Sequence, residues 1–522
     1  MRKILTLIIC LSQLSSFGQY GFSQTYEMNE PASSFHNTIW DGEYIVIAGT
    51  VRVDSLNQWG ILFAQMDTLG NVINQKTYTD TTGDDYIFEK DYSLIHTSDD
   101  GYLITGNLWD KNWGFMVKLD SQGELEFLQE YPDTIEYIRN YHFKKVIELS
   151  DGYLIAGTKQ INDYTSKTFV LKTDLNGNQI WEKKYGNLTQ SNPIGSIQYI
   201  DENTYVIGSG NSHFPFSSPY SYAEDWVQGK IFAIDSLGNI KWEWESELNV
   251  ESLVIGLKKT DNNEYIYTTG EMIIPNFYTV EGKRKVIKRD SNFNLIWSLD
   301  ISPSSTPINS SYDIQPTPDG NYVVIGNWAT PDSTAVNPLY GWYGACMTKF
   351  TEEGEQLWTR CDTLINTDEY IYNISFHTGF AGLTILPSGS IIVAGQVDRH
   401  DIQNQTARVI GWLFKVTPDG CLDTLCDLST ALFEPSITSE VIKVYPNPAS
   451  EVLNIYFKNN QNRKDGLFRL LDINGRVVLE LKAARNDLEY KIPLEKYASG
   501  IYFLQYMQEG ILMKSEKVVI AK

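Results

Sequence analysis

The chain of 522 residues has few of the side chains that build transition-metal sites. Its five cysteines include no CxxC-like pair, and no HExxH, HxH or Cys/His cluster occurs. Protein zinc sites use such closely spaced thiolate and imidazole ligands. We therefore expect no metal site and no cofactor. Paired loop acids such as Asp84-Asp85 and Glu224-Asp225 could still bind Ca²⁺ through oxygen, or serve glycoside chemistry. The six histidines are scattered singly: His36, His96, His142, His213, His377 and His400.

Long basic runs are also missing. The net charge is −23, and the basic triplet Lys283-Arg284-Lys285 is short. Nucleic acids and anionic lipids bind proteins through clustered Lys and Arg, so neither is an expected partner. The simplest interpretation of the charge is that it keeps a surface protein soluble.

Apolar runs of membrane-spanning length are absent. Arg2-Lys3 precedes an apolar stretch, Ile4–Leu14, and a polar exit follows at 15–19. This arrangement predicts a signal peptide over residues 1–19, because the stretch is too short for a resident transmembrane helix. Cys10 lies in the middle of the stretch, where a lipid-modified cysteine would not be. The mature protein is expected to have no transmembrane segment.

Helical periodicity is absent too, and a strand pattern recurs seven times between residues 30 and 426. A clear copy is Asp151–Thr158, then Phe169–Lys172, then Asp174–Trp181. The first part begins at an Asp-Gly-like turn and ends in a glycine. The second contains an Asp-x-x-Gly turn. The strand-ending glycines are 51 to 69 residues apart: Gly49, Gly106, Gly157, Gly208, Gly270, Gly326 and Gly395.

Each repeat has four strand signals, which predicts an all-β fold. Four short strands repeated every 50–60 residues favour a β-propeller blade. We expect seven blades over residues 20–426, with six or eight as alternatives. Aromatic residues recur at one register of the fourth strand and are expected in the core between blades; they are Phe127, Trp181, Trp242, Trp297 and Trp358.

The seventh repeat has no Trp strand after its Asp419-Gly420 turn. A spare segment, Thr25–Asn29, precedes the first repeat. We expect this segment to pair into the last blade and close the ring, which would hide an exposed strand edge.

Two disulfides are expected in an exported chain. Cys346 and Cys361 lie seven residues either side of a turn at Glu353-Gly354, so a hairpin would make them near neighbours. A bulge at that turn would make the pair diagonal. Cys421 and Cys426 are five residues apart and form the second expected pair.

Residues 427–441 are rich in Ser and Thr and indicate a linker. The tail, 442–522, has hairpin and strand signals, and we expect it to form a small Ig-like antiparallel β-sandwich. Three motifs follow in order: Tyr445-Pro446-Asn447-Pro448, Asn474-Gly475-Arg476 and Gly500-Ile501-Tyr502. This tail closely resembles the type A C-terminal sorting domain of the type IX secretion system of Bacteroidota.

The resemblance implies export through the periplasm and across the outer membrane, with the type IX machinery as partner. It also implies removal of the tail and attachment of the mature protein to surface polysaccharide. The sorting-motif residues would be Tyr445, Pro446, Asn447, Pro448, Gly475, Arg476, Gly500 and Tyr502.

The repeats loosely resemble kelch-like and quinoprotein-like (PQQ) propellers, but no catalytic residues can be matched to those families. No Gly-x-Ser-x-Gly nucleophile elbow occurs either. We therefore assign no catalytic residue.

Two long insertions, Asn211–Gln228 and Trp328–Tyr343, lie between the second and third strands of their blades and should share one face. Aromatic loops on a rigid scaffold often bind sugars or proteins, although these could instead cover the blade tops. A binding or adhesion scaffold for a glycan or surface protein is therefore the first hypothesis. The alternative is a hydrolase or lyase acting on extracellular polysaccharide. The candidate binding residues are Phe214, Phe216, Tyr220, Trp226, Tyr340 and Trp342.

Overall fold

The structure is a computed structural model, and it divides the chain into two compact units on either side of Leu428. No helix occurs among the residues that it describes, so the all-β prediction is confirmed, and no helix among them could cross a membrane. The described residues are 21–28, 32–53, 55–56, 58–87, 94–108, 111, 113–132, 141–162, 165–187, 190–213, 226–248, 250–276, 279–301, 308–331, 341–362, 378–401, 406–422, 442–457, 466–471, 477–485, 487–508 and 511–522.

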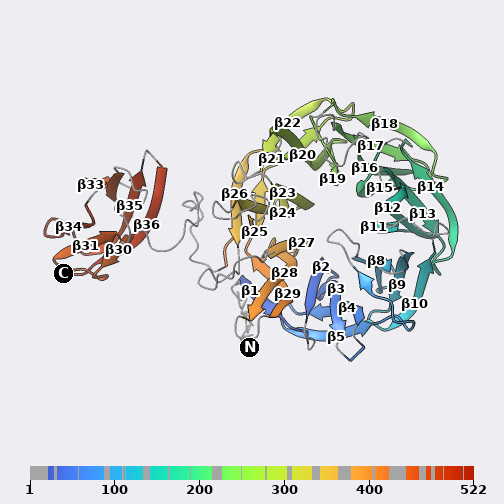
Figure 1. Cartoon of the computed structure of the whole chain (residues 1–522), viewed down its shortest axis with the longest axis horizontal. Helices are drawn as coiled ribbons and strands as arrows, with labels where there is room; N and C mark the ends of the chain where they lie inside the picture. Colours follow the sequence, from blue (N-terminus) through green and yellow to red (C-terminus); the bar gives the residue numbers. More distant parts are fainter. Residues whose placement is uncertain are drawn as a thin grey trace, which may run out of the picture. The chain divides into compact units, whose positions relative to one another are not determined.

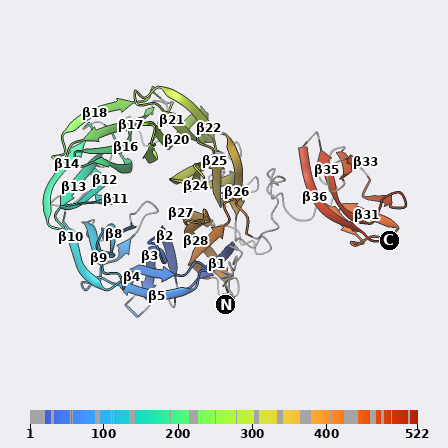
Figure 2. The same ribbon diagram turned by 180° about the vertical axis from the view of Figure 1, so that it is seen from behind.

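Seven antiparallel sheets form the first unit, within the described residues, and stand around a ring (Figures 1 and 2). Sheet 1 contains β2 (Ser33–Trp40), β3 (Ile45–Val53), β4 (Gln58–Met66) and β5 (Val72–Tyr78). Sheet 2 contains β6 (Tyr86–Ile87), β7 (Leu94–His96), β8 (Tyr102–Leu108), β9 (Trp113–Leu119) and β10 (Leu125–Tyr131). Sheet 3 contains β11 (Tyr141–Leu149), β12 (Gly152–Asn162), β13 (Thr165–Thr173) and β14 (Gln179–Tyr185). Sheet 4 contains β15 (Ile194–Asp201), β16 (Thr204–His213), β17 (Trp226–Ile234) and β18 (Ile240–Glu245). Sheet 5 contains β19 (Ile255–Lys259), β20 (Tyr265–Asn276), β21 (Thr279–Arg289) and β22 (Leu295–Asp300). Sheet 6 contains β23 (Ile308–Pro316), β24 (Tyr322–Pro331), β25 (Gly341–Phe350) and β26 (Gln356–Asp362). Sheet 7 contains β27 (Thr378–Ile385), β28 (Ile391–Asp401), β29 (Thr406–Val416) and β1 (Phe22–Tyr26).

In the sheets of four consecutive strands, the first strand lies toward the ring centre and the fourth lies at the outside, as in a β-propeller (Figure 1). A buried apolar cluster fills each of the seven junctions between neighbouring sheets. One of these clusters contains Phe35 and Ile47 of sheet 1 together with Ile392 and Leu413 of sheet 7. The first and last sheets therefore pack like any other neighbouring pair, which closes the ring.

The Asp-x-x-Gly turns have a clear physical cause. The Asp174 carboxylate accepts hydrogen bonds from the backbone N–H groups of Asn176 and Asn178, at 2.9 and 2.8 Å. Gly177 has φ of 80°, a left-handed conformation that glycine adopts without strain. The turn thus joins the third and fourth strands of its sheet, β13 and β14.

Five of the seven strand-ending glycines face a bulge in the first strand of their sheet. Gly157 in β12 pairs with Phe143, directly beside the register shift between Phe143 and Lys145 in β11. A Cβ atom at Gly157 would lie 2.0 Å from the carbonyl oxygen of His142. The bulge therefore brings the two backbones too close together for any larger residue.

Fourth-strand aromatic residues lie against the turn between the third and fourth strands of the next sheet. The Trp297 indole covers Gly354 and donates from Nε1 to the carbonyl oxygen of Glu352 at 3.0 Å. The ring of Trp181 likewise lies against Gly238. Both side chains are half-buried, so they seal the outer end of the junction and are not at its centre.

A tyrosine four residues further along the same strand adds a hydrogen bond to that turn. Tyr131 and Tyr185 donate to the carbonyl oxygens of Gly177 and Gly238, at 2.6 and 2.8 Å. The sequence interpretation missed this aromatic-x-x-x-Tyr pattern. It occurs as Phe127–Tyr131, as Trp181–Tyr185 and, at the start of the chain, as Phe22–Tyr26.

Strand β1 is the outer strand of sheet 7. Residues Phe22–Tyr26 pair antiparallel with Lys415–Gly411 of β29, and Tyr26 donates to the Gly70 carbonyl oxygen in sheet 1 at 2.8 Å. The prediction that the N-terminal segment closes the ring is confirmed, but the pairing segment begins three residues earlier than predicted. Strand β1 thus takes the place of the missing Trp strand.

Two sheets form the C-terminal unit. One contains β30 (Ile442–Tyr445), β31 (Val452–Phe457) and β34 (Glu489–Pro493) in that order. The other has the order β33 (Val477–Ala483), β32 (Gly466–Leu471), β35 (Gly500–Gln508) and β36 (Ile511–Ile520). A single buried cluster that includes Leu453, Phe468 and Leu504 contains residues of both sheets.

Candidate functional site

The side chain of Asn447 connects the first segment of the C-terminal unit to its last strand. Its Oδ1 accepts a hydrogen bond from the Val519 N–H at 2.8 Å, and its Nδ2 donates to the Lys517 carbonyl oxygen at 2.7 Å. Ala449 continues this contact with two backbone hydrogen bonds of 2.8 Å: its N–H donates to the Val519 carbonyl oxygen of β36, and its carbonyl oxygen accepts from the N–H of Ala521, just after β36. The Asn447 side-chain amide thus forms the two hydrogen bonds that a neighbouring strand would form with β36, and it joins two segments that are far apart in sequence.

Other motif residues lie at the same end of β36. Gly500 pairs with Ile520, and the Tyr502 hydroxyl donates to the Ala498 carbonyl oxygen at 3.1 Å. Tyr445 is 43% exposed, and its peptide bond to Pro446 is cis, as is that between Asn447 and Pro448. The structure therefore brings the first and third motifs together around the last strand. Gly475 and Arg476 lie outside the described residues.

The candidate aromatic face falls mostly outside the described residues, which exclude Phe214, Phe216, Tyr220 and Tyr340. The backbones of Trp226 and Trp342 are described and lie at the starts of β17 and β25. The hairpins β16–β17 and β24–β25 each join the second and third strands of their sheets. Both insertions therefore emerge at the same end of their sheets, opposite the Asp-x-x-Gly turns.

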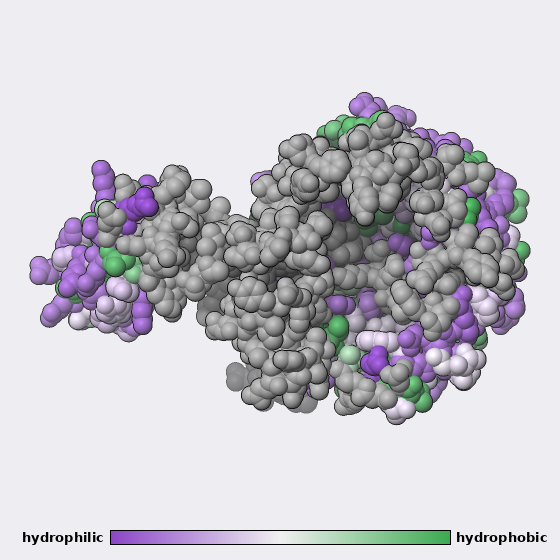
Figure 3. All heavy atoms as spheres, viewed as in Figure 1, coloured by the Kyte–Doolittle hydropathy of each residue, from purple (hydrophilic) through white to green (hydrophobic). Residues whose placement is uncertain are grey.

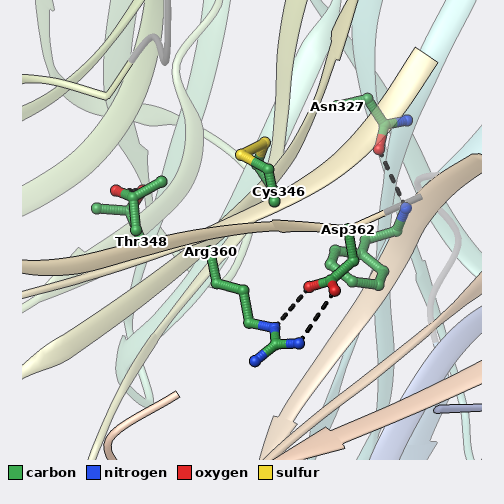
Figure 4. The surroundings of a disulfide bond; sticks show 8 residues. Asn327, Cys346, Thr348, Arg360 and Asp362 are labelled. Atoms are coloured by element: carbon green, nitrogen blue, oxygen red, sulfur yellow. Dashed lines mark hydrogen bonds and ion pairs between the residues drawn. A yellow bond between two sulfur atoms is a disulfide. The ribbon is translucent and has the colours of Figure 1, made fainter. Parts of the chain in front are cut away.

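Cys346 and Cys361 are directly opposite each other in β25 and β26, and their sulfurs are bonded (Figure 4). The hairpin has a bulge between Lys349 and Phe350. The expectation that a bulge would make the pair diagonal is wrong, because the extra residue brings the two cysteines into register. Cys421 is also disulfide-bonded, and its expected partner Cys426 lies outside the described residues.

Polar side chains surround this disulfide. The Arg360 guanidinium forms two hydrogen bonds to the Asp362 carboxylate, at 2.6 and 3.1 Å (Figure 4). Arg360 also donates to the Gly420 carbonyl oxygen at 3.0 Å, in the turn of sheet 7. Sheet 6, which lacks a tyrosine at the register of Tyr185, is thus joined to the next sheet by an arginine.

Residues 443–521 match the family described as "Secretion system C-terminal sorting domain". The C-terminal unit is therefore similar to a sorting domain, and the sequence-based recognition of it is confirmed. A sorting domain of this kind indicates a protein that is secreted or attached to the cell surface. No curated protein matches the sequence.

The solved structures that match this chain have low sequence identity to it. The β-propeller domain of the Trilobed protease from Pyrococcus furiosus is 9% identical, with a TM-score of 0.36, and the match covers 76% of this chain and 99% of that one. Acylaminoacyl peptidase from Pyrococcus horikoshii is 9% identical, with a TM-score of 0.39, covering 84% and 60%. The endo-arabinase from Bacteroides thetaiotaomicron is 9% identical, with a TM-score of 0.28, covering 62% and 92%.

Between sheets 4 and 5 lies a buried charged network. Glu251 is 2% exposed, forms an ion pair with Arg289 and accepts a hydrogen bond from the Tyr267 hydroxyl at 2.7 Å. The Arg289 guanidinium lies 4.6 Å from the centre of the Trp244 ring. Burial, and then the Glu251 charge, raises the pKa of Tyr267 well above its usual value. This tyrosine stays protonated and donates to Glu251, so the network joins two sheets.

Acidic side chains gather around Lys111 between sheets 1 and 2. Its Nζ lies 3.0 Å from an Asp84 carboxylate oxygen and 3.7 Å from oxygens of Asp80 and Glu130. Burial raises the pKa of Glu130. No group of three or more His, Cys, Asp or Glu side chains among the described residues is arranged to hold a metal ion. Lys111 thus provides the positive charge here, and Glu224 and Asp225 lie outside the described part of the chain.

Proposed function

We propose that this protein is exported by the type IX secretion system and that its seven-bladed β-propeller binds a glycan or a surface protein outside the cell. The sorting-domain match at residues 443–521 carries the export half of this proposal. Seven sheets around a ring with seven buried junctions support the blade count. Two packed antiparallel sheets support an Ig-like sandwich for the sorting domain.

The binding role rests on how the two ends of the blades differ. One end has tight Asp-x-x-Gly turns whose backbone is fixed by the Asp side chain, as at Asp174 and Asp235. The other end has the long hairpins β16–β17 and β24–β25, which carry aromatic residues. Loops on a rigid scaffold are where proteins commonly place binding residues. We therefore place the binding surface on the hairpin end.

The export proposal is tested by deleting residues 443–522 and measuring where the protein accumulates in cells that have a type IX system. We expect the deletion variant to stay in the periplasm and the full chain to reach the surface or the medium. A deletion variant that still reaches the surface would contradict the proposal.

The binding proposal is tested on the mature protein with a glycan array and, in parallel, a polysaccharide degradation screen. Binding without degradation would support a scaffold. Release of oligosaccharides would show that the chain is a hydrolase or lyase instead.

A further inference from the structure

The sorting domain has a concavity of about 310 Å³ where the outer strands β33 and β34 lie near each other. Leu479, Leu481 and Ile492 are apolar residues of its lining, and Lys491, Glu495 and Lys496 are its charged ones. Leu479 and Leu481 are only partly buried against the domain core. The concavity is thus an open extension of the core between the two sheets.

The two sides of the sandwich differ. On one side Asn447 and Ala449 are bonded to β36, which joins the two sheets. On the other side, within the described residues, β33 pairs only with β32 and β34 pairs only with β31. Such edge strands accept an added strand through their backbone groups, while a neighbouring pocket selects a side chain.

The charge of this domain is opposite to that of the whole chain. Residues 443–522 contain thirteen Lys and Arg but nine Asp and Glu, whereas the chain has a net charge of −23. At the concavity, the Lys491 side chain is 65% exposed, and its ammonium lies 3.8 Å from a Glu489 carboxylate oxygen. The Lys496 ammonium lies 5.3 Å from the centre of the Tyr497 ring. The lining holds two lysines against one glutamate, Glu495, so a partner that docks here meets a net positive charge on both the concavity and the domain, which favours an acidic segment.

We propose that the concavity is the recognition surface of the sorting domain and that it takes an extended, acidic segment of the export machinery. The segment adds a strand along β33 and places one apolar side chain between Leu481 and Ile492. Lys491 and Lys496 attract its carboxylates. This inference rests on the proposed export function and names the part of the domain that the export machinery recognises.

Export of the full-length protein tests the proposal with matched variants. Leu481→Trp fills the concavity, and the pair Lys491→Glu with Lys496→Glu reverses the charge of its rim. The control, Lys443→Glu compared with Lys491→Glu alone, makes the same charge change at an exposed position that does not line the concavity. We expect both concavity variants to lower the exported fraction by about tenfold and the control to leave it unchanged.

Equal midpoints of urea unfolding for all variants show that the fold is intact. If Leu481→Trp shifts the midpoint, the proposal is judged from the export of the Lys491→Glu, Lys496→Glu variant alone. Export of the charge pair at the wild-type level would overturn the proposal. If residues 443–522 are still required in that case, the export function stands and only the recognition surface is wrong. Export without those residues would overturn both.

A photocrosslinking residue in place of Lys491, compared with one in place of Lys443, identifies the occupant in exporting cells. We expect a cross-link at position 491 alone, to a peptide of a membrane export protein with more Asp and Glu than Lys and Arg. A cross-link to a second copy of this chain, to a basic segment, or equally from both positions would overturn the proposal.

Discussion

Tyr26 donates its hydroxyl hydrogen to the carbonyl oxygen of Gly70 at 2.8 Å, across the junction between the last and the first sheet. The residues are 44 apart in sequence, and Tyr26 belongs to the strand that completes sheet 7. The same contact recurs between Tyr131 and Gly177 and between Tyr185 and Gly238. The N-terminal strand is therefore held in the ring by the same contact as an ordinary fourth strand.

Removing this hydroxyl should weaken ring closure. We expect Tyr26→Phe to lower the free energy of unfolding by about 1 kcal/mol, because the Gly70 carbonyl loses its donor within a buried junction. Urea unfolding of the purified protein measures the effect. Tyr199→Phe is the matched control, because the Tyr199 side chain is 46% exposed. Equal losses for the two variants would contradict the role of Tyr26 in closure.

The disulfide between Cys346 and Cys361 should stabilise the first unit. The two cysteines are 15 residues apart in sequence. A cross-link that closes a loop of that length stabilises a fold by about 3 kcal/mol, because it lowers the entropy of the unfolded chain. We expect the double variant Cys346→Ala with Cys361→Ala to unfold at a lower urea concentration without any reductant. Leaving reductant out keeps the Cys421 disulfide intact in both proteins. An unchanged midpoint would show that the hairpin is already fixed by its strand pairing.

The acid sensitivity of the ring should depend on Asp99. Burial alone would raise its pKa, but hydrogen bonds from Thr97 and Lys118 outweigh that effect and lower the pKa to about 2. A carboxylate whose pKa is lowered by folding stabilises the fold above its unfolded pKa of about 4 and loses that contribution as the pH falls to about 2.

We therefore expect Asp99→Asn to be less stable than the wild type at pH 7, and the difference to shrink between pH 4 and pH 2. Urea midpoints across this pH range measure it. Asp100→Asn, which removes the same charge one residue away, is the matched control. A difference for Asp99→Asn that is constant with pH would contradict the assignment.

Replacing only one partner of the buried ion pair between sheets 4 and 5 should lower the free energy of unfolding strongly. Glu251→Ala leaves the Arg289 charge without its carboxylate, for which we expect a loss of about 3–5 kcal/mol. Replacing both partners by apolar residues, with Glu251→Leu and Arg289→Met, should cost less than the single change. A double-mutant cycle followed by urea unfolding tests this. Additive losses would show that the two side chains do not depend on each other.

Local features could be predicted from the sequence, because each is determined by a few adjacent residues. Asp174 and Gly177 define a turn through their own hydrogen bonding and φ preference, and the turn was predicted. Tyr185 was missed because its acceptor, Gly238, lies 53 residues away and only the ring brings them together. The register of Cys346 and Cys361 depends on one bulge, whose position a turn motif alone does not determine. The network of Glu251 and Arg289 joins two repeats and carries no repeated signal.

Asn447 should be needed both for the fold of the sorting domain and for export. Asn447→Ala removes two hydrogen bonds to β36, so we expect a loss of about 1–2 kcal/mol. Asn447→Asp should cost more, because its carboxylate faces the Lys517 carbonyl oxygen that now accepts a hydrogen bond. Asn454→Ala, which removes a single hydrogen bond to the Tyr445 carbonyl oxygen, is the matched control.

Limited proteolysis of the full chain and the exported fraction together measure these changes. We expect protease resistance of residues 443–522 and export to fall in parallel, in the order Asn454→Ala, Asn447→Ala and Asn447→Asp. In that case the first motif acts by joining the two ends of the domain. Loss of export by Asn447→Ala with unchanged protease resistance would show instead that the machinery contacts Asn447 directly, and the structural role assigned to this side chain would be wrong.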